Sequence, residues 1–229
     1  MTSITPSAQY RLNVRVEIDD SPGLLGAVTS AIGQAGGVVG AVDPVEIESG
    51  HSLRDIVVDT AGPEHWETIV AAIDALEGAH VIDRIDRTFQ LHIGGKIEQH
   101  NKHPLKTRDD LSMAYTPGVA RVCMAIHHDF EQAWDYTIKA NSLMVVSDGS
   151  DVLGLGDIGA EASLPACEAK SLFLRNLAGI DAFPLPVDAR DPAAIVDAVA
   201  LCSSVFAGDR KSTRLNSSHM VQSRMPSSA

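Results

Sequence analysis

The glycine-rich segment at residues 154–159 is the first pattern in the chain that could carry chemistry. It reads Gly-Leu-Gly-Asp-Ile-Gly, which matches the G-x-G-x-x-G spacing of a turn that holds a dinucleotide pyrophosphate. An apolar run at 143–146 predicts a buried strand before it, and acidic residues follow at Asp181 and Asp188. The pattern supports one hypothesis, a Rossmann-type oxidoreductase that holds its cofactor at Gly154–Gly159. Asp157 argues against this hypothesis, because a carboxylate beside a pyrophosphate would repel it.

A tyrosine and a lysine have the side chains for proton transfer. Tyr115 directly precedes the turn signal Thr116-Pro117-Gly118, so we expect its hydroxyl at the lip of a loop, where it can meet a ligand. Lys170 lies in a predicted helix whose neighbours are small or apolar, among them Ala166, Cys167, Ala169 and Leu172. By residue type alone, each could equally be an ordinary surface or packing side chain.

Three segments in a fixed order place these two residues in a wider pattern. They are KTRDDLSMAYTPGVARVC at 106–123, VVSDGSDVLGLGDIGAEASLP at 145–165, and EAK at 168–170 followed by GIDAFPLPVDARD. Together they resemble the N-terminal catalytic domain of bacterial malic enzymes over roughly residues 95–205. The resemblance implies an incomplete α/β substrate domain at 105–208. It also implies that the glycine run belongs to this domain, while a separate, later Rossmann domain holds the cofactor.

The resemblance also implies a reaction and two residue roles. The reaction is metal-dependent oxidative decarboxylation of (S)-malate to pyruvate and CO2, with NAD or NADP reduced and Mg2+ or Mn2+ required. By position, Tyr115 is implied as the general acid and Lys170 as the general base. A lysine can take a proton from the malate hydroxyl if burial or a nearby cation lowers its pKa, and a phenol can protonate the enolate of pyruvate. We interpret Asp109 and Asp110 as helix-start residues rather than as metal ligands.

The chain departs from the family pattern after residue 208. The family's metal ligands lie beyond the Lys170 helix, in a region that this chain does not match, so we predict no metal or nicotinamide site in it. Residues 209–229 hold six Ser and four Lys or Arg against one acid and show no helical or strand period, which predicts disorder. This tail resembles translated sequencing-adapter read-through, an artefact. We expect this polypeptide itself to be inactive, because it lacks the electron sink and the hydride acceptor.

Residues 10–88 predict a β-α-β-β-α-β order. The strands are expected at 10–18, 38–48, 52–60 and 79–88. Two helices over one face of a four-stranded antiparallel sheet form the ferredoxin-like arrangement, and the segment resembles an ACT domain, a small-molecule-sensing module. The resemblance implies allosteric regulation by an effector bound at Asp20, Gly23 and Leu24, and a homodimer in the full-length form.

Residues 89–104 are predicted to be a solvated linker, since Gly94-Gly95 and a polar stretch break the periodicity. Its histidines, His92, His100 and His103, have a spacing that fits no usual set of metal ligands.

The ACT resemblance of residues 10–88 supports a second hypothesis for the whole chain, a non-catalytic protein that senses an amino acid or similar metabolite.

Composition argues against several other classes of protein, namely those that bind nucleic acid, span a membrane or are built on disulfides. Among 229 residues, 18 Lys and Arg stand against 30 Asp and Glu, which gives a net charge of −12. Because no basic cluster offsets this charge, we expect no binding to nucleic acid or to anionic lipid. Three widely spaced cysteines argue against a disulfide framework or a zinc site. No apolar run is long enough to span a membrane and no signal peptide is recognisable, so we expect a cytoplasmic protein.

Overall fold

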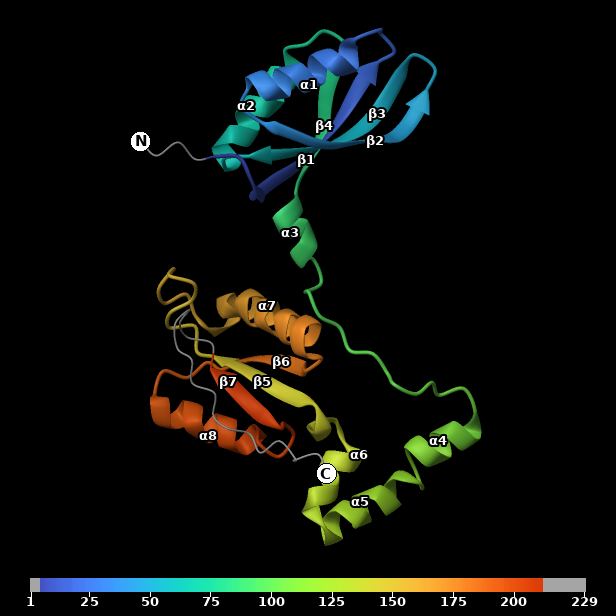
Figure 1. Cartoon of the computed structure of the whole chain (residues 1–229), viewed down its shortest axis with the longest axis vertical. Helices are drawn as coiled ribbons and strands as arrows, with labels where there is room; N and C mark the ends of the chain where they lie inside the picture. Colours follow the sequence, from blue (N-terminus) through green and yellow to red (C-terminus); the bar gives the residue numbers. More distant parts are fainter. Residues whose placement is uncertain (1–4, 212–229) are drawn as a thin grey trace. The chain divides into compact units, whose positions relative to one another are not determined.

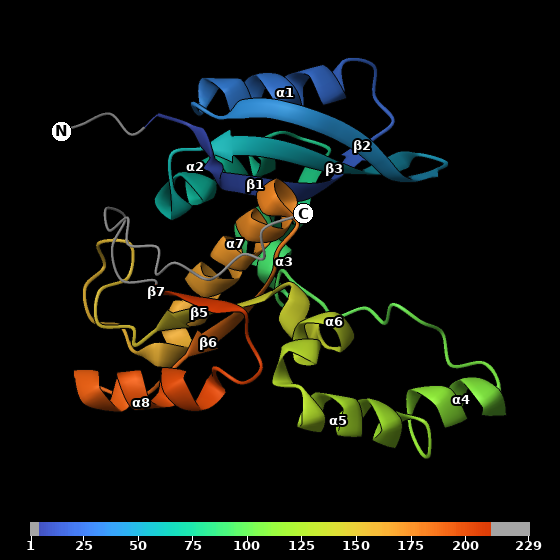
Figure 2. The ribbon, with the colours of Figure 1, turned by 60° about the horizontal axis from the view of Figure 1, so that its bottom comes forward.

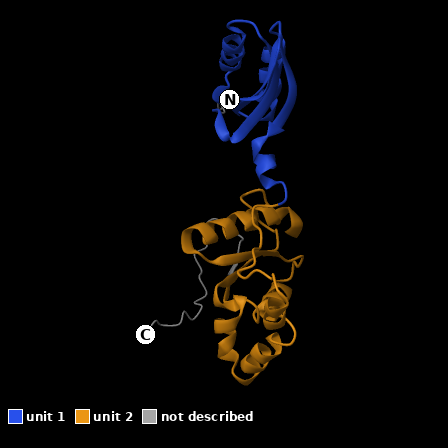
Figure 3. Ribbon diagram, turned by 90° about the vertical axis from the view of Figure 1, so that its right-hand side faces the viewer, with its two compact units in different colours: residues 1–94 blue, residues 95–229 orange. Residues whose placement is uncertain are grey.

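The chain divides into two compact units, residues 1–94 and 95–229 (Figure 3). The computed structural model describes residues 5–211, with residues 209–211 described by their backbone alone. Each unit has its own sheet and its own helices, so we describe each by itself. Among the described residues, no helix combines the length and the apolar composition needed to cross a bilayer.

Unit 1 contains four strands, two long helices and one short helix. Their bounds are β1 Ser7–Asp19, α1 Leu24–Gln34, β2 Val38–Glu48, β3 His51–Thr60, α2 Pro63–Asp74, β4 Ala79–Asp86 and α3 Arg87–His92. The strands form one antiparallel sheet in the order β2-β3-β1-β4, and α1 and α2 pack on one of its faces (Figure 1). The predicted ferredoxin-like arrangement is therefore confirmed.

The apolar-polar alternation in β1 decides which face of the sheet meets the helices. Every second residue from Leu12 to Ile18 is at most 2% exposed. These side chains pack against buried residues of α1 and α2, namely Val28, Ile32, Ile69 and Ile73. Because side chains of a strand alternate between faces, Arg11, Asn13 and Arg15 point to the opposite face, which α1 and α2 leave uncovered.

The end of β4 differs from the prediction of a strand over 79–88. The strand stops at Asp86, whose carboxylate accepts hydrogen bonds from the backbone N–H groups of Thr88 at 2.8 Å and Phe89 at 3.3 Å. This N-cap starts α3. The Thr88 hydroxyl also donates to the carbonyl of Gln9 at 3.0 Å and holds α3 beside β1. Residues 89–92, predicted as part of the solvated linker, are therefore helical.

Unit 2 contains helices first and a parallel sheet after them. The bounds are α4 Arg108–Ala114, α5 Val119–His128, η1 Phe130–Gln132, α6 Ala133–Tyr136, η2 Ile138–Ala140, β5 Ser142–Ser147, α7 Ala160–Ala178, β6 Asp181–Pro186, α8 Pro192–Cys202 and β7 Gly208–Lys211. The strand order is β6-β5-β7, with α7 on one face and α8 on the other (Figure 1). This alternation of parallel strands and helices confirms the predicted α/β class.

Strand β7 crosses the boundary predicted at residue 208. Its backbone pairs in parallel with β5, from Gly208 opposite Leu143 to Lys211 opposite Val146. Residues 209–211, predicted as the start of a disordered tail, are therefore part of the sheet, because backbone pairing does not require an apolar side chain. The rest of that predicted tail lies outside the described residues.

Candidate active site

Tyr115 lies at the C-terminal end of α4, directly before a tight turn. Its backbone N–H donates to the carbonyl of Leu111 at 2.8 Å, and its own carbonyl accepts from the N–H of Val119 at 2.7 Å. The N–H of Gly118 donates to the carbonyl of Ser112 at 2.8 Å, which folds the turn back against α4. Tyr115 is 65% exposed. The phenol is therefore accessible from outside the chain, and the turn fixes the backbone that carries it.

The start of α4 is held by a capping box between Thr107 and Asp110. The Thr107 hydroxyl accepts from the N–H of Asp110 at 3.0 Å, and the Asp110 carboxylate accepts from the N–H of Thr107 at 2.9 Å. Hydrogen bonds from Thr107 and from the backbone of Lys106 lower the pKa of Asp110. The interpretation of Asp109 and Asp110 as helix-start residues is thus confirmed, since both lie in the first turn of α4.

Lys170 lies on α7 and is half-buried. Its neighbours Cys167 and Ser171 are at most 1% exposed, because this stretch of α7 packs against the parallel sheet. Because Cys167 and Ser171 face the sheet, the side chain of Lys170 lies at the edge of the packed interior, next to solvent. A lysine at such a border has both a restricted environment and access to a ligand.

Lys96, at the start of unit 2, contacts α7 at residues just before Lys170. The backbone N–H of Lys96 donates to the Glu168 carboxylate at 3.1 Å, and the Lys96 ammonium donates to the carbonyl of Pro165 at 2.8 Å. The ammonium also lies 3.8 Å from the Glu168 carboxylate, and these side chains are only 7% and 15% exposed. Sequence reasoning missed this pair, because residues 95–96 were assigned to a solvated linker.

The glycine run forms a self-contained loop before α7. The N–H groups of Ile158 and Gly159 donate to the carbonyl of Gly149 at 3.0 and 3.3 Å, and Asp157 pairs with Arg190 at 2.8 Å. Gly149 is obligatory, because a Cβ there would lie within 2.1 Å of backbone atoms of Gly159. Two amide donors that a pyrophosphate would need are therefore already bonded within the loop, and a carboxylate sits beside them. This geometry does not fit a nicotinamide cofactor at Gly154–Gly159.

Within one chain, the structure does not bring Tyr115 and Lys170 together. The loop between α4 and α5 lies away from α7 in both Figure 1 and Figure 2. Among residues 5–211, no group of three or more His, Cys, Asp or Glu side chains is placed to hold a metal ion. The described residues thus do not fit the Mg2+ or Mn2+ that the resemblance implies.

The loop with the predicted effector residues Asp20, Gly23 and Leu24 joins β1 to α1. The N–H of Asp20 donates to the carbonyl of Gly50 at 3.0 Å, and Leu24 packs against the core of unit 1. Gly23 has a φ of 88° and no atom within 4 Å of the position of a Cβ, so the backbone is open to a ligand there. An effector site at this loop stays a prediction.

Comparison with known proteins identifies relatives of most of the chain. Residues 94–202 match the family model of the malic enzyme N-terminal domain. The NAD-dependent malic enzyme of Geobacillus stearothermophilus is 41% identical over 201 residues, which cover 88% of this chain and 42% of the relative. NAD-dependent malic enzyme 1 of Bacillus subtilis (strain 168) is 38% identical over 194 residues, covering 84% of this chain and 44% of the relative. The chain therefore spans less than half the length of these relatives, and both matches extend into unit 1.

Solved structures give the same result for slightly more than half of the chain. The malic enzyme from Pyrococcus horikoshii Ot3 has a TM-score of 0.50 and 43% identity, with 51% of this chain and 27% of that chain covered. The NAD-dependent malic enzyme from Thermotoga maritima has a TM-score of 0.53 and 37% identity, with 56% of this chain and 36% of that chain covered.

Proposed function

Because residues 94–202 match the malic enzyme N-terminal domain, we propose that this chain is the N-terminal part of an enzyme that oxidatively decarboxylates (S)-malate to pyruvate and CO2 with NAD or NADP. The match of residues 94–202 to the family model carries the proposal, since it contains both candidate proton-transfer residues. The names of the relatives leave NAD and NADP open, because they include both NAD- and NADP-dependent malic enzymes.

In this proposal Lys170 is the general base and Tyr115 the general acid. Lys170 would accept the proton of the malate C2 hydroxyl, and a bound nicotinamide would take the hydride from C2. Tyr115 then donates a proton to C3 of the enolate that remains after CO2 is lost. The half-buried position of Lys170 and the exposed phenol of Tyr115 support these roles. The family resemblance implies that a divalent metal would supply the electron sink for decarboxylation, and no group of side chains among residues 5–211 is placed to hold one.

The separation of Tyr115 from Lys170 supports a homodimer in which one subunit supplies the tyrosine and the other the lysine. Helices α4 and α5 expose apolar side chains that a second copy would cover, among them Leu111 at 48%, Met113 at 69% and Met124 at 50%. A symmetric dimer buries the same surface on both subunits, so two equivalent sites would form.

We propose that unit 1 is an ACT-type regulatory module and that Asp20, Gly23 and Leu24 contact its effector. The ferredoxin-like topology and the open backbone at Gly23 support this role. A cytoplasmic location belongs to the same proposal, supported by three free cysteines at Cys123, Cys167 and Cys202.

The experiment that tests the proposal uses the full-length protein, expressed from its complete gene. Its activity is measured with malate, Mn2+ and either NAD+ or NADP+ by the absorbance of the reduced nicotinamide. The variants Tyr115→Phe and Lys170→Ala are each expected to lower kcat by about 10²–10⁴-fold. Wild-type kcat in either variant would contradict the role of that residue.

Mixing the two variants tests the shared site. In a mixed dimer with exchanged tyrosines, one of the two sites contains both native residues, so about a quarter of the wild-type activity should return after subunit exchange. If each subunit used its own Tyr115 and Lys170, every site in the mixture would lack one residue. The absence of any recovery in confirmed mixed dimers would therefore refute the exchange.

A further inference from the structure

The contacts of Lys96 converge on one turn of α7, from Pro165 to Glu168. Its ammonium donates to the carbonyl of Pro165 at 2.8 Å and lies 3.8 Å from the Glu168 carboxylate, which also accepts from the Lys96 backbone N–H at 3.1 Å. The side chains of Lys96 and Glu168 are only 7% and 15% exposed. Because charged side chains are rarely buried this far and water screens them little there, these contacts hold residue 96 to α7 more firmly than an exposed ion pair would.

The residue before Lys96 allows the backbone to approach α7 this closely. Gly95 has a φ of 83°, a conformation that other residues rarely adopt, and a Cβ there would lie 3.0 Å from Oε1 of Glu168. A larger residue would therefore strain the backbone and press on the carboxylate that binds Lys96. The approach of residues 95–96 to the helix is thus specified by the sequence itself.

Pro165 weakens α7 at the turn that Lys96 contacts. It is the sixth of the 19 residues of α7, beyond the first turn in which proline is tolerated. Because proline has no backbone N–H, the helical bond that would run back to the carbonyl of Glu161 cannot form. Lys96 supplies a hydrogen bond from outside the helix at this interruption, so the turn does not depend on the helical bonds alone.

Lys170 lies at the end of the segment that Lys96 holds. It follows Pro165 by five residues, about 7–8 Å along the helix axis, and it follows Glu168 by two. The sheet contacts α7 through the buried Cys167, and Glu168 lies about 100° around the helix from that residue. The helix is thus held from two directions, which opposes rotation about its axis and fixes the backbone from which the Lys170 side chain extends.

We propose that Lys96 and Glu168 are positioning residues for Lys170, an inference that rests on the proposed role of Lys170 as general base. Neither residue contacts the substrate in this role. Their pair holds the Lys170 backbone at the place from which its amine can reach the C2 hydroxyl of malate. Because a shift of about 1 Å in a catalytic group costs about 10²-fold in rate, loss of Lys96 should slow proton removal more than it weakens the binding of malate.

The experiment compares two reactions of the full-length protein, expressed from its complete gene and assayed with Mn2+. The first is the oxidation of malate with NAD+ or NADP+, which needs a base at the C2 hydroxyl. The second is the decarboxylation of oxaloacetate, the 2-oxo acid that loss of the hydride and the proton leaves, which in the proposed roles needs Tyr115 but not the base. Lys96→Met should lower kcat for malate by about 10²-fold and leave KM for malate and the rate with oxaloacetate within about twofold of wild type.

A second variant tests whether the two residues act as a pair. Glu168→Gln keeps an acceptor for the Lys96 backbone N–H and should give the same selective loss of malate oxidation. The double variant should be no slower than the slower single variant, because both changes remove one shared contact. Losses that multiply in the double variant would show that the two residues act separately, and would overturn their assignment as a pair.

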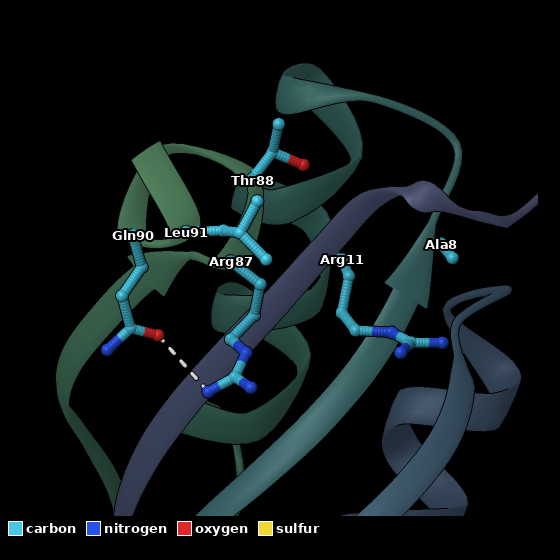
Figure 4. A pocket seen from close by; sticks show the side chains of 6 residues that line it. All are labelled: Ala8, Arg11, Arg87, Thr88, Gln90 and Leu91. Carbon is cyan, nitrogen blue, oxygen red and sulfur yellow. Dashed lines mark hydrogen bonds between the residues drawn. The ribbon is translucent and has the colours of Figure 1, made fainter. Parts of the chain in front are cut away.

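Arg11→Met is the matched control, since it breaks a comparable ion pair in unit 1. Arg11 on β1, labelled in Figure 4, donates to Asp59 through Nε at 2.6 Å and Nη2 at 3.1 Å. Arg15 binds Asp55 in the same way, at 2.8 and 2.9 Å, so the sheet keeps a second pair of this kind. Arg11→Met should lower stability without changing kcat or KM for malate. A fall in kcat equal to that of Lys96→Met would mean that the loss follows from stability, and would overturn the positioning role.

Hydrogen exchange tests the contact without any substrate. In the 229-residue chain, the backbone amides of residues 166–170 should exchange about 10-fold faster in Lys96→Met than in wild type, since the turn loses its bonds from outside the helix. The exchange rates are measured by NMR. Equal rates in the two proteins would show that Lys96 does not hold this turn.

The kinetic outcomes separate this inference from the proposed function. If the wild type oxidised malate and Lys170→Ala did not, while Lys96→Met kept the wild-type kcat or lost both reactions equally, the positioning role would be wrong and the proposed function would stand. If the wild type oxidised no malate, the proposed function would fail, and the role of Lys96 toward a base would fail with it.

Discussion

Replacing Gly118 by alanine should displace the turn that carries Tyr115. A Cβ at residue 118 would lie 2.5 Å from the carbonyl oxygen of Ser112 and 2.7 Å from that of Met113, whereas ordinary contact begins at 3.4 Å. Both atoms belong to the backbone and cannot rotate away, so the turn must move by about the shortfall of 0.9 Å. The φ of Gly118 is −61°, so the obstacle is the space available rather than the backbone conformation.

The size of the effect follows from this displacement. A shift of about 1 Å in a catalytic group costs about 10²-fold in rate, so kcat of full-length Gly118→Ala should fall about 100-fold. Overpacking also costs about 1–3 kcal/mol of folding free energy. The unfolding free energy, from urea denaturation, and kcat with malate, Mn2+ and NAD+ are therefore measured on the same preparation.

A second glycine provides the control for Gly118. Gly33 lies inside α1 with no atom within 4 Å of a Cβ position, so Gly33→Ala should raise stability by about 0.5–1 kcal/mol and leave kcat unchanged. If Gly118→Ala lost stability but kept the wild-type kcat, the position of Tyr115 would not depend on this turn. Our assignment of the turn as the element that positions the phenol would then be wrong.

Three further predictions concern activity, pH and stability. The 229-residue chain should show no turnover with malate, NAD+ and Mn2+, since no group of side chains among residues 5–211 is placed to hold the Mn2+ that would act as electron sink; measurable NADH from the purified chain would contradict this. Hydrogen bonds from their arginine partners lower the pKa values of Asp55 and Asp59 below the usual 3.8. The folded state therefore binds fewer protons, so the stability that the pairs provide is present above pH 3.8 and is lost as pH falls through the folded pKa values. An acid titration of Tm should show this loss in the wild type and less of it in Asp55→Asn. The Lys139 ammonium donates to three backbone carbonyls just after α8, at 2.7, 3.3 and 2.8 Å, so Lys139→Met should cost about 1–3 kcal/mol in urea denaturation, and an unchanged midpoint would show the contacts to be dispensable.

Local patterns in the sequence predicted most of the elements. The alternation in β1 and the helical spacing after it each bury one face, and two such helices over a four-stranded sheet have few alternative arrangements. The apolar run at 143–146 likewise predicted β5, because a strand covered on both faces needs a continuous apolar stretch. These predictions rest on periodicity over short distances, which sequence alone expresses.

Some element boundaries could not be predicted, since they depend on single contacts. The N-cap bond of Asp86 ends β4 and begins α3 at a place where the sequence reads as a continuing strand. Strand β7 forms because the open edge of β5 pairs with any backbone that reaches it, whatever its side chains. Neither the N-cap of Asp86 nor the pairing of β7 leaves a hydrophobic periodicity in the sequence, so neither could be predicted from one.

The candidate site, like the fold, was predictable from sequence in one part and decided by tertiary structure in another. The order of three motifs predicted Tyr115 and Lys170 as catalytic residues through the resemblance to malic enzymes, since residue type alone left each an ordinary side chain, and this assignment stays a prediction. The separation of Tyr115 from Lys170 arises only when α4 and α7 take their positions within unit 2. The unpartnered Oδ1 of Asn13 arises only when the strands of unit 1 assemble around it. A buried acceptor without a donor depends on which atoms surround it from distant parts of the chain, and that is decided by tertiary structure alone.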